Sequence, residues 1–248
     1  MKHFILFLSL LSFTALGQAD FEKNLQKRLI LAEDGSTIEI EAGRFQLTKG
    51  LSLEGKKNIT LRGKGIDKTT LSFKGQTQGA EGIRVSNCEN IVIEDMTTED
   101  SKGDLIKTMN VKGITFRRIK AAWTGGPKST NGSYGLYPVL CDNVLIDSCI
   151  AIGASDAGIY VGQSQHIIVR NCEAYQNVAG IEIENSLYAD VYNNKAIGNT
   201  GGILVFDLPD LVQKKGGHVR VHHNLVKDNN LANFAPKGNI VGNVPKGT

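Results

Sequence analysis

A glycine followed by a branched apolar residue recurs at a nearly constant interval through the sequence. The pairs are Gly82-Ile83, Gly135-Leu136, Gly158-Ile159, Gly180-Ile181 and Gly202-Ile203. The last three intervals are 23, 22 and 22 residues. Between the glycines, apolar and polar residues alternate in short runs bounded by Gly and Asn, which is the period of β-strands and not of helical repeats. A fixed period of this length predicts a stack of β coils.

Stacking the coils turns inward-facing positions into ladders that form one continuous core. We expect ladder partners to lie about 4.8 Å apart, the spacing of paired strands. The fold class predicted is all-β: a single-stranded right-handed parallel β-helix of about eight to nine coils of roughly 22 residues, with a short N-terminal capping helix. Two longer intervals place loops at Trp123–Gly132 and Phe206–Gly217. The predicted ladders are Ile83, Ile106, Leu136, Ile159, Ile181, Ile203 and Ala121, Ala151, Ala174, Ala196.

Three segments are predicted along the chain. Residues 1–19 contain a lysine, an apolar run and small residues near a cleavage point, the pattern of a signal peptide. Residues 20–34 place Phe21, Leu25 and Leu29 four apart, which predicts a short amphipathic helix that covers the open first coil. Residues 35–248 form the β-helix, and we expect it to be incomplete at the C-terminus because the repeat stops without a cap.

Composition narrows the class of partner and the location. The chain has 28 basic and 25 acidic residues and a net charge of +3, with the basic residues dispersed, so we expect no nucleic-acid partner. No stretch after the signal peptide reaches the roughly 18 to 20 apolar residues of a membrane span. We therefore expect an exported protein, periplasmic or extracellular, without a membrane span.

Several segments resemble a known family. GASDAGIYVGQSQHIIVRNC, AGIEIENS, TGGILVFDLP and NFAPKGNIVG are similar to bacterial parallel β-helix repeat proteins of the pectate-lyase-like superfamily, over roughly residues 35–248. The resemblance implies the fold and, by association, polysaccharide as partner. The superfamily's best-known catalytic signatures are mostly absent. Two functions therefore stay open: an enzyme of the lyase, epimerase or glycoside hydrolase type, and a non-catalytic periplasmic or surface binding module.

Candidate site residues lie on the outward side of the first strand of each coil. Glu184 points the same way as Glu182, Asp156 precedes a glycine turn, and these three carboxylates are the candidate acids and bases. Lys107 is a fourth catalytic candidate, as the cation that a lyase or epimerase needs. Tyr137, Tyr160, Arg84 and Trp123 are the substrate-binding candidates, since aromatic rings stack on sugars. The successive outward residues are Arg84, Lys107, Tyr137, Tyr160, Glu182 and Leu204.

A plainer interpretation explains the same residues. Tyr, Lys, Arg and Glu are common on half-exposed strands whatever the function. Trp123, the single tryptophan, either stacks on a sugar or plugs its own loop. The two loops border the first strand and favour a walled groove there.

The second strand of each coil has a different outward face. Val92, Leu145 and Ile168 make it largely apolar, which predicts cover by a loop or a protein partner. The next outward position alternates in charge through Glu94, Arg117, Asp147 and Arg170, and predicts structural ion pairs.

Metal and thiol signals are sparse. His222 and His223 are adjacent and expected on opposite faces of a strand, so no metal site is predicted; a calcium site at Asp156 is the one alternative, and no other cofactor is expected. Cys149 and Cys172 stack on successive coils. They are either a ladder of buried thiols or, in an oxidising compartment, a disulfide.

Overall fold

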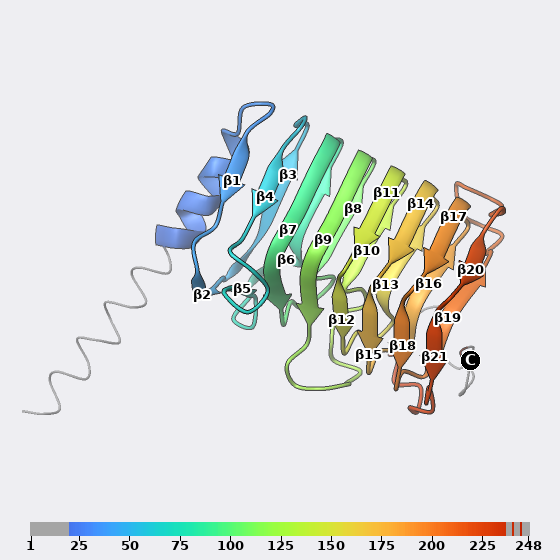
Figure 1. Cartoon of the computed structure of the whole chain (residues 1–248). Helices are drawn as coiled ribbons and strands as arrows, with labels where there is room; N and C mark the ends of the chain where they lie inside the picture. Colours follow the sequence, from blue (N-terminus) through green and yellow to red (C-terminus); the bar gives the residue numbers. More distant parts are fainter. Residues whose placement is uncertain (1–19, 237–239, 241–243, 245–248) are drawn as a thin grey trace, which may run out of the picture.

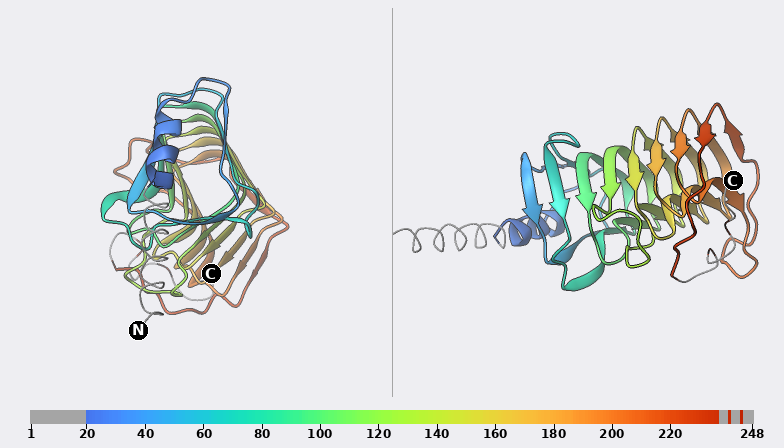
Figure 2. Two further views of the ribbon diagram at one scale, coloured as in Figure 1. Left: turned by 90° about the vertical axis from the view of Figure 1, so that its left-hand side faces the viewer. Right: turned by 90° about the horizontal axis from the view of Figure 1, so that it is seen from below.

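The chain folds into stacked β coils with a helix at one end (Figure 1). This computed structural model describes residues 20–236, 240 and 244. Each coil contributes one short strand to each of three rows, and every strand pairs in parallel with its equivalents in the neighbouring coils. Viewed along the axis, the rows enclose a narrow prism (Figure 2). The predicted all-β parallel β-helix is therefore confirmed.

The first row is a seven-stranded sheet that carries the candidate residues. Its strands are β3 (Lys49–Glu54), β6 (Gln78–Ser86), β8 (Ile106–Met109), β10 (Leu136–Val139), β13 (Ala157–Gly162), β16 (Ala179–Glu184) and β19 (Gly201–Phe206).

The second and third rows join into one 14-stranded sheet, because β7 (Glu89–Glu99) and β9 (Lys112–Ala122) run through both. The second row also contains β1 (Thr37–Glu39), β4 (Thr60–Arg62), β11 (Asp142–Asp147), β14 (Gln165–Arg170), β17 (Leu187–Tyr192) and β20 (Arg220–His222). The third row also contains β2 (Gly43–Gln46), β5 (Thr69–Ser72), β12 (Ile150–Ile152), β15 (Glu173–Tyr175), β18 (Lys195–Ile197) and β21 (Leu225–Lys227).

Sharp corners between the rows require left-handed backbone. Asn is the non-glycine residue that tolerates this conformation best, which explains its recurrence at the corners. At one corner of three successive coils, Asn143, His166 and Tyr188 all have φ between 54° and 56°. The corners therefore repeat with the coils, and this holds the strands in register.

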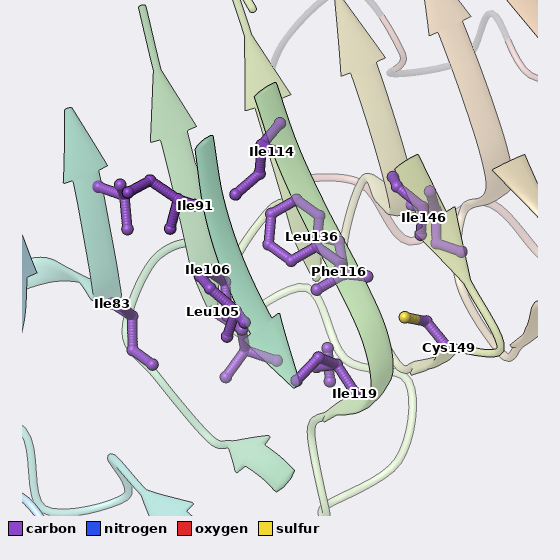
Figure 3. Close-up of a cluster of buried hydrophobic side chains, with 14 of the residues drawn as sticks. Ile83, Ile91, Leu105, Ile106, Ile114, Phe116, Ile119, Leu136, Ile146 and Cys149 are labelled. Atoms are coloured by element: carbon purple, nitrogen blue, oxygen red, sulfur yellow. The ribbon is translucent and has the colours of Figure 1, made fainter. Parts of the chain in front are cut away.

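The core is the one-dimensional stack that the ladders predict. Ile106 pairs with Leu136, Leu136 with Ile159 and Ile159 with Ile181, and the alanine ladder pairs in the same way on the third row. Figure 3 shows side chains from several coils, among them Ile91, Ile114 and Phe116, filling the interior. Each coil thus buries its apolar side chains only together with its neighbours.

The helix spans residues 20–30, four residues shorter at its end than the predicted segment. Its own Leu25 and Leu29 are buried in the core of the coils, and the ring of Phe21 stacks on Phe45 at 3.7 Å. Its polar side chains pair with the free edge of β3: the Gln26 amide accepts from the Ser52 N–H at 2.8 Å and donates to the Ser52 carbonyl at 3.0 Å. The helix therefore satisfies edge groups that no earlier strand pairs with.

The charged ladder on the second row runs through Glu39, Arg62, Glu94, Arg117, Asp147 and Arg170 in successive coils. Arg62 Nε lies 2.6 Å from Glu94 Oε1, and Arg117 Nη1 lies 3.3 Å from Glu94 Oε2. Arg170 Nη2 lies 2.8 Å from Asp147 Oδ2. The predicted ion pairs are therefore confirmed between Glu94 and Arg117 and between Asp147 and Arg170.

At the last coil, inward ladder positions are open to solvent. Val205, Val221 and Val226 are exposed, although their partners Ile183, Val191 and Ala196 one coil earlier are buried. The predicted signal peptide, residues 1–19, lies outside the described residues. Among the described residues, no helix has the length and apolarity to cross a membrane.

Candidate active site on the outer face of the first row

The register of the first row brings the outward candidates into one line. Arg84 pairs with Lys107, Lys107 with Tyr137, and Tyr160 with Glu182. Leu136 pairs with Ile159, so the next residues, Tyr137 and Tyr160, also lie side by side. The line therefore changes along the axis from cations through aromatic rings to carboxyl groups, in the order that the sequence predicts.

Three tyrosine rings form the middle of the line. The Tyr137 and Tyr160 ring centroids are 4.9 Å apart, with the rings at 82°. Tyr134 completes the cluster at 4.4 Å from Tyr137 and 4.6 Å from Tyr160. The sequence analysis missed Tyr134 because it ends the loop before β10 and is not part of the repeat. The edge-to-face packing of Tyr137 and Tyr160 leaves no pair of parallel faces for a sugar.

The three carboxyl groups that the sequence predicts lie around this cluster, together with Asp104, which accepts from the Tyr134 backbone N–H at 3.3 Å. The Asp156 carboxylate accepts a hydrogen bond from the Tyr134 hydroxyl, and Glu184 accepts one from Tyr160. Glu182 is 3% exposed, and its Oε2 atom has no hydrogen-bond partner among the described residues. The structure therefore brings Asp156, Glu182 and Glu184 together, as their spacing predicts.

A glycine makes room for this arrangement. Gly162 occupies the outward position of β13 that pairs with Glu184, and the Tyr160 ring lies directly over it, where a Cβ atom would overlap the phenol. Because Gly162 has no side chain, the Tyr160 hydroxyl reaches Glu184 on the next coil.

Burial sets the protonation of the acidic groups. Desolvation raises the pKa of Asp156 to about 7, and the nearby charge of Glu184 adds to the shift. Desolvation, with Asp156 and Glu184 close by, holds the pKa of Glu182 well above its usual range. The pKa of Glu184 is also raised by burial. Buried carboxyl groups with raised pKa values gather at functional sites, because acid–base chemistry at neutral pH requires them.

The C-terminal segment covers the carboxyl end of the line. Phe234, Ala235, Ile240 and Val244 belong to the same apolar cluster as Tyr160, which is 4% exposed. The open groove expected beside Tyr137 and Tyr160 is therefore filled at Tyr160. This contact cannot be predicted from the repeat, because Phe234 and Ala235 follow the last strand and show no strand period.

The cations lie apart from Asp156, Glu182 and Glu184. Arg84 is exposed and Lys107 half-buried; both are near Glu81, at 3.8 and 4.0 Å, and the Lys107 Nζ atom sits 4.5 Å from the Tyr137 ring centroid. Lys107 is separated from Glu182 by the strands that carry Tyr137 and Tyr160. The two cations thus form the far end of the line rather than part of the acidic cluster.

Trp123 plugs its loop in this structure. It is 4% exposed, and its indole N–H donates to the Ser101 carbonyl at 3.0 Å. Of the two roles considered for Trp123, the geometry matches the structural one, because a buried indole presents no face to a sugar.

Comparison with known proteins places the fold. A family model described as the right-handed beta helix region matches residues 49–210 and 128–243, which together cover more than half of the chain. The chain belongs to this right-handed beta helix family. The parallel pairing of strands between successive coils agrees with this assignment.

Several curated relatives are appendage proteins of Bacillus phages. The pre-neck appendage protein of Bacillus phage phi29 is 29% identical over 174 residues, covering 62% of this chain and 19% of that protein. The pre-neck appendage protein of Bacillus phage B103 is 24% identical over 207 residues, covering 69% and 24%. The chain thus spans about a fifth to a quarter of the length of these relatives.

Solved structures give similarity of fold alone. A pectate lyase superposes with a TM-score of 0.48 at 14% identity, covering 72% of this chain and 61% of that one. The A-module of a mannuronan C-5 epimerase from Azotobacter vinelandii superposes with a TM-score of 0.43 at 12% identity, covering 85% and 82%.

The stacked cysteines of this β-helix are thiols in the structure. Cys149 and Cys172 are both buried and free, and the backbone N–H of Cys149 donates to the Cys172 sulfur at 3.5 Å. The next coils place Asn194 and Asn224 at the equivalent position, where each side chain accepts the same kind of bond from the preceding coil. The geometry is that of a ladder of polar side chains, and the disulfide considered from the sequence is not formed here.

His222 and His223 do not lie on opposite faces of a strand, so the prediction that their rings point apart is wrong. β20 ends at His222, and His223 has a left-handed backbone with φ 55°, so the two rings do not point to opposite faces. Their Nδ1 atoms lie 2.7 Å apart. No group of three or more His, Cys, Asp or Glu side chains in the described part of the chain is arranged to hold a metal ion.

The apolar outward line on the second row is short. Val92, Thr115, Leu145 and Ile168 follow one another in register, and Ile168 is 37% exposed. The line ends at Asp190, which pairs with Ile168 on the next coil and carries a charge.

Proposed function

We propose that this β-helix acts on polysaccharide by acid–base catalysis at the cluster of Asp156, Glu182 and Glu184. The supporting observation is that three carboxyl groups, two on β16 and one in the turn before β13, lie together and desolvated beside the tyrosine rings. Water-exposed strand residues that served only solubility would keep ordinary pKa values.

The protonation states divide the roles. Asp156, with a pKa of about 7, carries its proton in about half of the molecules at neutral pH and suits the general acid. Glu184, hydrogen-bonded to Tyr160, suits the base or nucleophile. Burial favours the protonated form of Glu182, which suits it to donate to the substrate through the carboxyl oxygen that has no partner among the described residues.

Hydrolysis is favoured over lyase or epimerase chemistry. Glycoside hydrolases use a pair of carboxyl groups, one protonated and one ionised, on either side of the scissile bond. A lyase or epimerase needs a cation beside the base to hold a uronate, and Lys107 and Arg84 lie at the other end of the line. These cations and Tyr137 instead suit binding of neighbouring sugars along the coil axis.

The test is a panel of neutral glycans, alginate, pectate and chondroitin, with reducing ends and unsaturated products measured separately. We expect new reducing ends without unsaturated products, and their loss in the double variant Asp156→Asn, Glu182→Gln. Glu173→Gln, on the third row and ion-paired with Lys195, is the matched control. Full turnover by the double variant would remove the proposal.

Phe234 and Ala235 pack against the apolar cluster that contains Tyr160. A substrate can therefore reach the carboxyl groups only when these two residues move away. Phe234→Ala should therefore raise turnover, or lower the substrate concentration at half-maximal rate. No cofactor enters this mechanism. Calcium at Asp156 is tested in the same assay by adding EDTA, which should leave the rate unchanged.

The second candidate is a non-catalytic binding module, exported to the periplasm or the cell exterior. Its support is the similarity to phage appendage proteins and the exposed Ile168 in the apolar line with Val92 and Leu145. A protein partner bound there should be lost in Leu145→Lys without a change in unfolding. Mass spectrometry of the exported chain, expected to begin at Asp20, tests the location.

A further inference from the structure

We propose that His222 and His223 form an exposed chelate for a divalent transition metal ion, with Cu²⁺ and Ni²⁺ preferred over Zn²⁺. The pair lies at the end of β20 on the last coil, away from the acidic cluster of the first row. The two Nδ1 atoms are 2.7 Å apart, and the rings meet edge to face with centroids 5.0 Å apart.

His222 is held in place before any metal binds. Its Nε2 atom lies 2.8 Å from Asp190 Oδ1, and its ring stacks on Tyr192 at 5.3 Å and 5°. Because a carboxylate only accepts hydrogen bonds, Nε2 carries the proton and Nδ1 turns its lone pair toward His223. A carboxylate behind a histidine is the arrangement that orients metal-binding histidines and raises their basicity.

His223 is brought to the same point by its backbone. In a continuing strand, its side chain would point to the opposite face. With φ 55°, the corner turns it back toward His222. With this tautomer of His222, His223 Nδ1 must donate the hydrogen that lies between the two nitrogens. A metal ion bound to both Nδ1 atoms would displace this proton to His223 Nε2 or to solvent, and would lie to one side of the line that joins the nitrogens.

The spacing of the nitrogens selects the metal. Metal–imidazole bonds are about 2.0–2.1 Å long, so nitrogens 2.7 Å apart subtend an angle of roughly 80° at a shared ion. That is near the right angle of tetragonal Cu²⁺ and Ni²⁺ sites, whereas a tetrahedral Zn²⁺ site needs a separation of roughly 3.3 Å. Since the described residues offer no group of three ligands, water completes the coordination sphere and the ion exchanges freely.

The test is calorimetric titration of the untagged His3→Ala chain with Cu²⁺, combined with electron paramagnetic resonance, because the amino terminus and His3 could together bind Cu²⁺ independently of the pair. We expect one ion per chain with two coupled nitrogens. His223→Asn, which keeps a residue suited to the left-handed corner, should weaken binding at least tenfold, and Asp190→Asn about tenfold.

The chain has five histidines, so the triple variant His3→Ala, His166→Ala, His218→Ala retains only the pair. It should bind Cu²⁺ as the His3→Ala chain does. Equal affinity in His223→Asn, or loss of binding in the triple variant, would overturn the assignment, and unchanged unfolding curves establish that each variant is folded.

Discussion

The phenol of Tyr160 lies directly over the Cα atom of Gly162, where any side chain would collide with it. This contact places the Tyr160 hydroxyl against Glu184 on the next coil. A residue with no side chain therefore controls the position of an aromatic ring in the candidate site.

Gly162→Ala should displace the Tyr160 ring and break its hydrogen bond to Glu184. We expect a loss of about 1–3 kcal/mol in the free energy of unfolding, the usual cost of overpacking, and a loss of turnover if the proposed chemistry holds. Urea denaturation measures the first. Gly75→Ala is the control, since a Cβ atom there meets nothing within 4 Å. Equal stability of the two variants would contradict the contact.

Asp156 should make the fold less stable as pH rises. Its pKa is about 7 when folded and about 3.9 when unfolded, so between these values the folded chain binds more protons. Stability is fully present below pH 4 and is lost as pH rises through 7, the reverse of an ion-paired carboxylate.

Asp156→Asn removes this loss and should be more stable than the unaltered chain by about 1–3 kcal/mol at pH 8, with little difference at pH 4. Urea midpoints at the two pH values measure the effect. Asp210→Asn, on an exposed loop, should show no such difference. A stability difference independent of pH would mean that Asp156 is not desolvated.

The repeat made the fold predictable because its information is local and redundant. The glycine and the alternation of apolar and polar residues recur in the next coil. The ladder through Leu136, Ile159 and Ile181 therefore follows from the length of the repeat. The same repeat length placed Tyr137 beside Tyr160 and Glu182 beside Tyr160. Nothing in it required knowledge of side-chain conformation.

The features that the repeat could not predict involve residues outside the repeating strands. Tyr134 and Phe234 lie outside the strands, and only folding brings them onto the first row. The side chain of His223 does not follow the alternation of a strand, because β20 ends at His222 and the next residue has a positive φ. Whether an outward residue is exposed also depends on such segments, which is why the burial of Tyr160 could not be foreseen.

Glu94 should be the most costly charged residue to neutralise on the second row. It is nearly buried and contacts Arg62, Arg117 and Arg118, at 2.6, 3.3 and 3.5 Å. Glu94→Gln leaves three guanidinium groups without their shared carboxylate, and we expect a loss of about 1–3 kcal/mol in unfolding free energy.

The matched control is Glu89→Gln. Its carboxylate is exposed and, among the described residues, forms an ion pair with Lys57 alone, at 3.3 Å, so its removal should cost less than about 1 kcal/mol. Similar urea midpoints for the two variants would show that Glu94 acts as an ordinary surface charge.

The four cysteines should all be titratable thiols that react only after unfolding. Each is buried, and desolvation raises the pKa values of Cys88, Cys141 and Cys172, so little thiolate is present in the folded chain. A thiol reagent should therefore react slowly at pH 8 and then label four sulfurs in guanidinium. Two labelled sulfurs instead of four, restored to four by a reductant, would establish a disulfide between Cys149 and Cys172.

The variant Cys172→Asn offers a second check. The following coils already have Asn194 and Asn224 at this position, so the variant should fold and expose three thiols after unfolding.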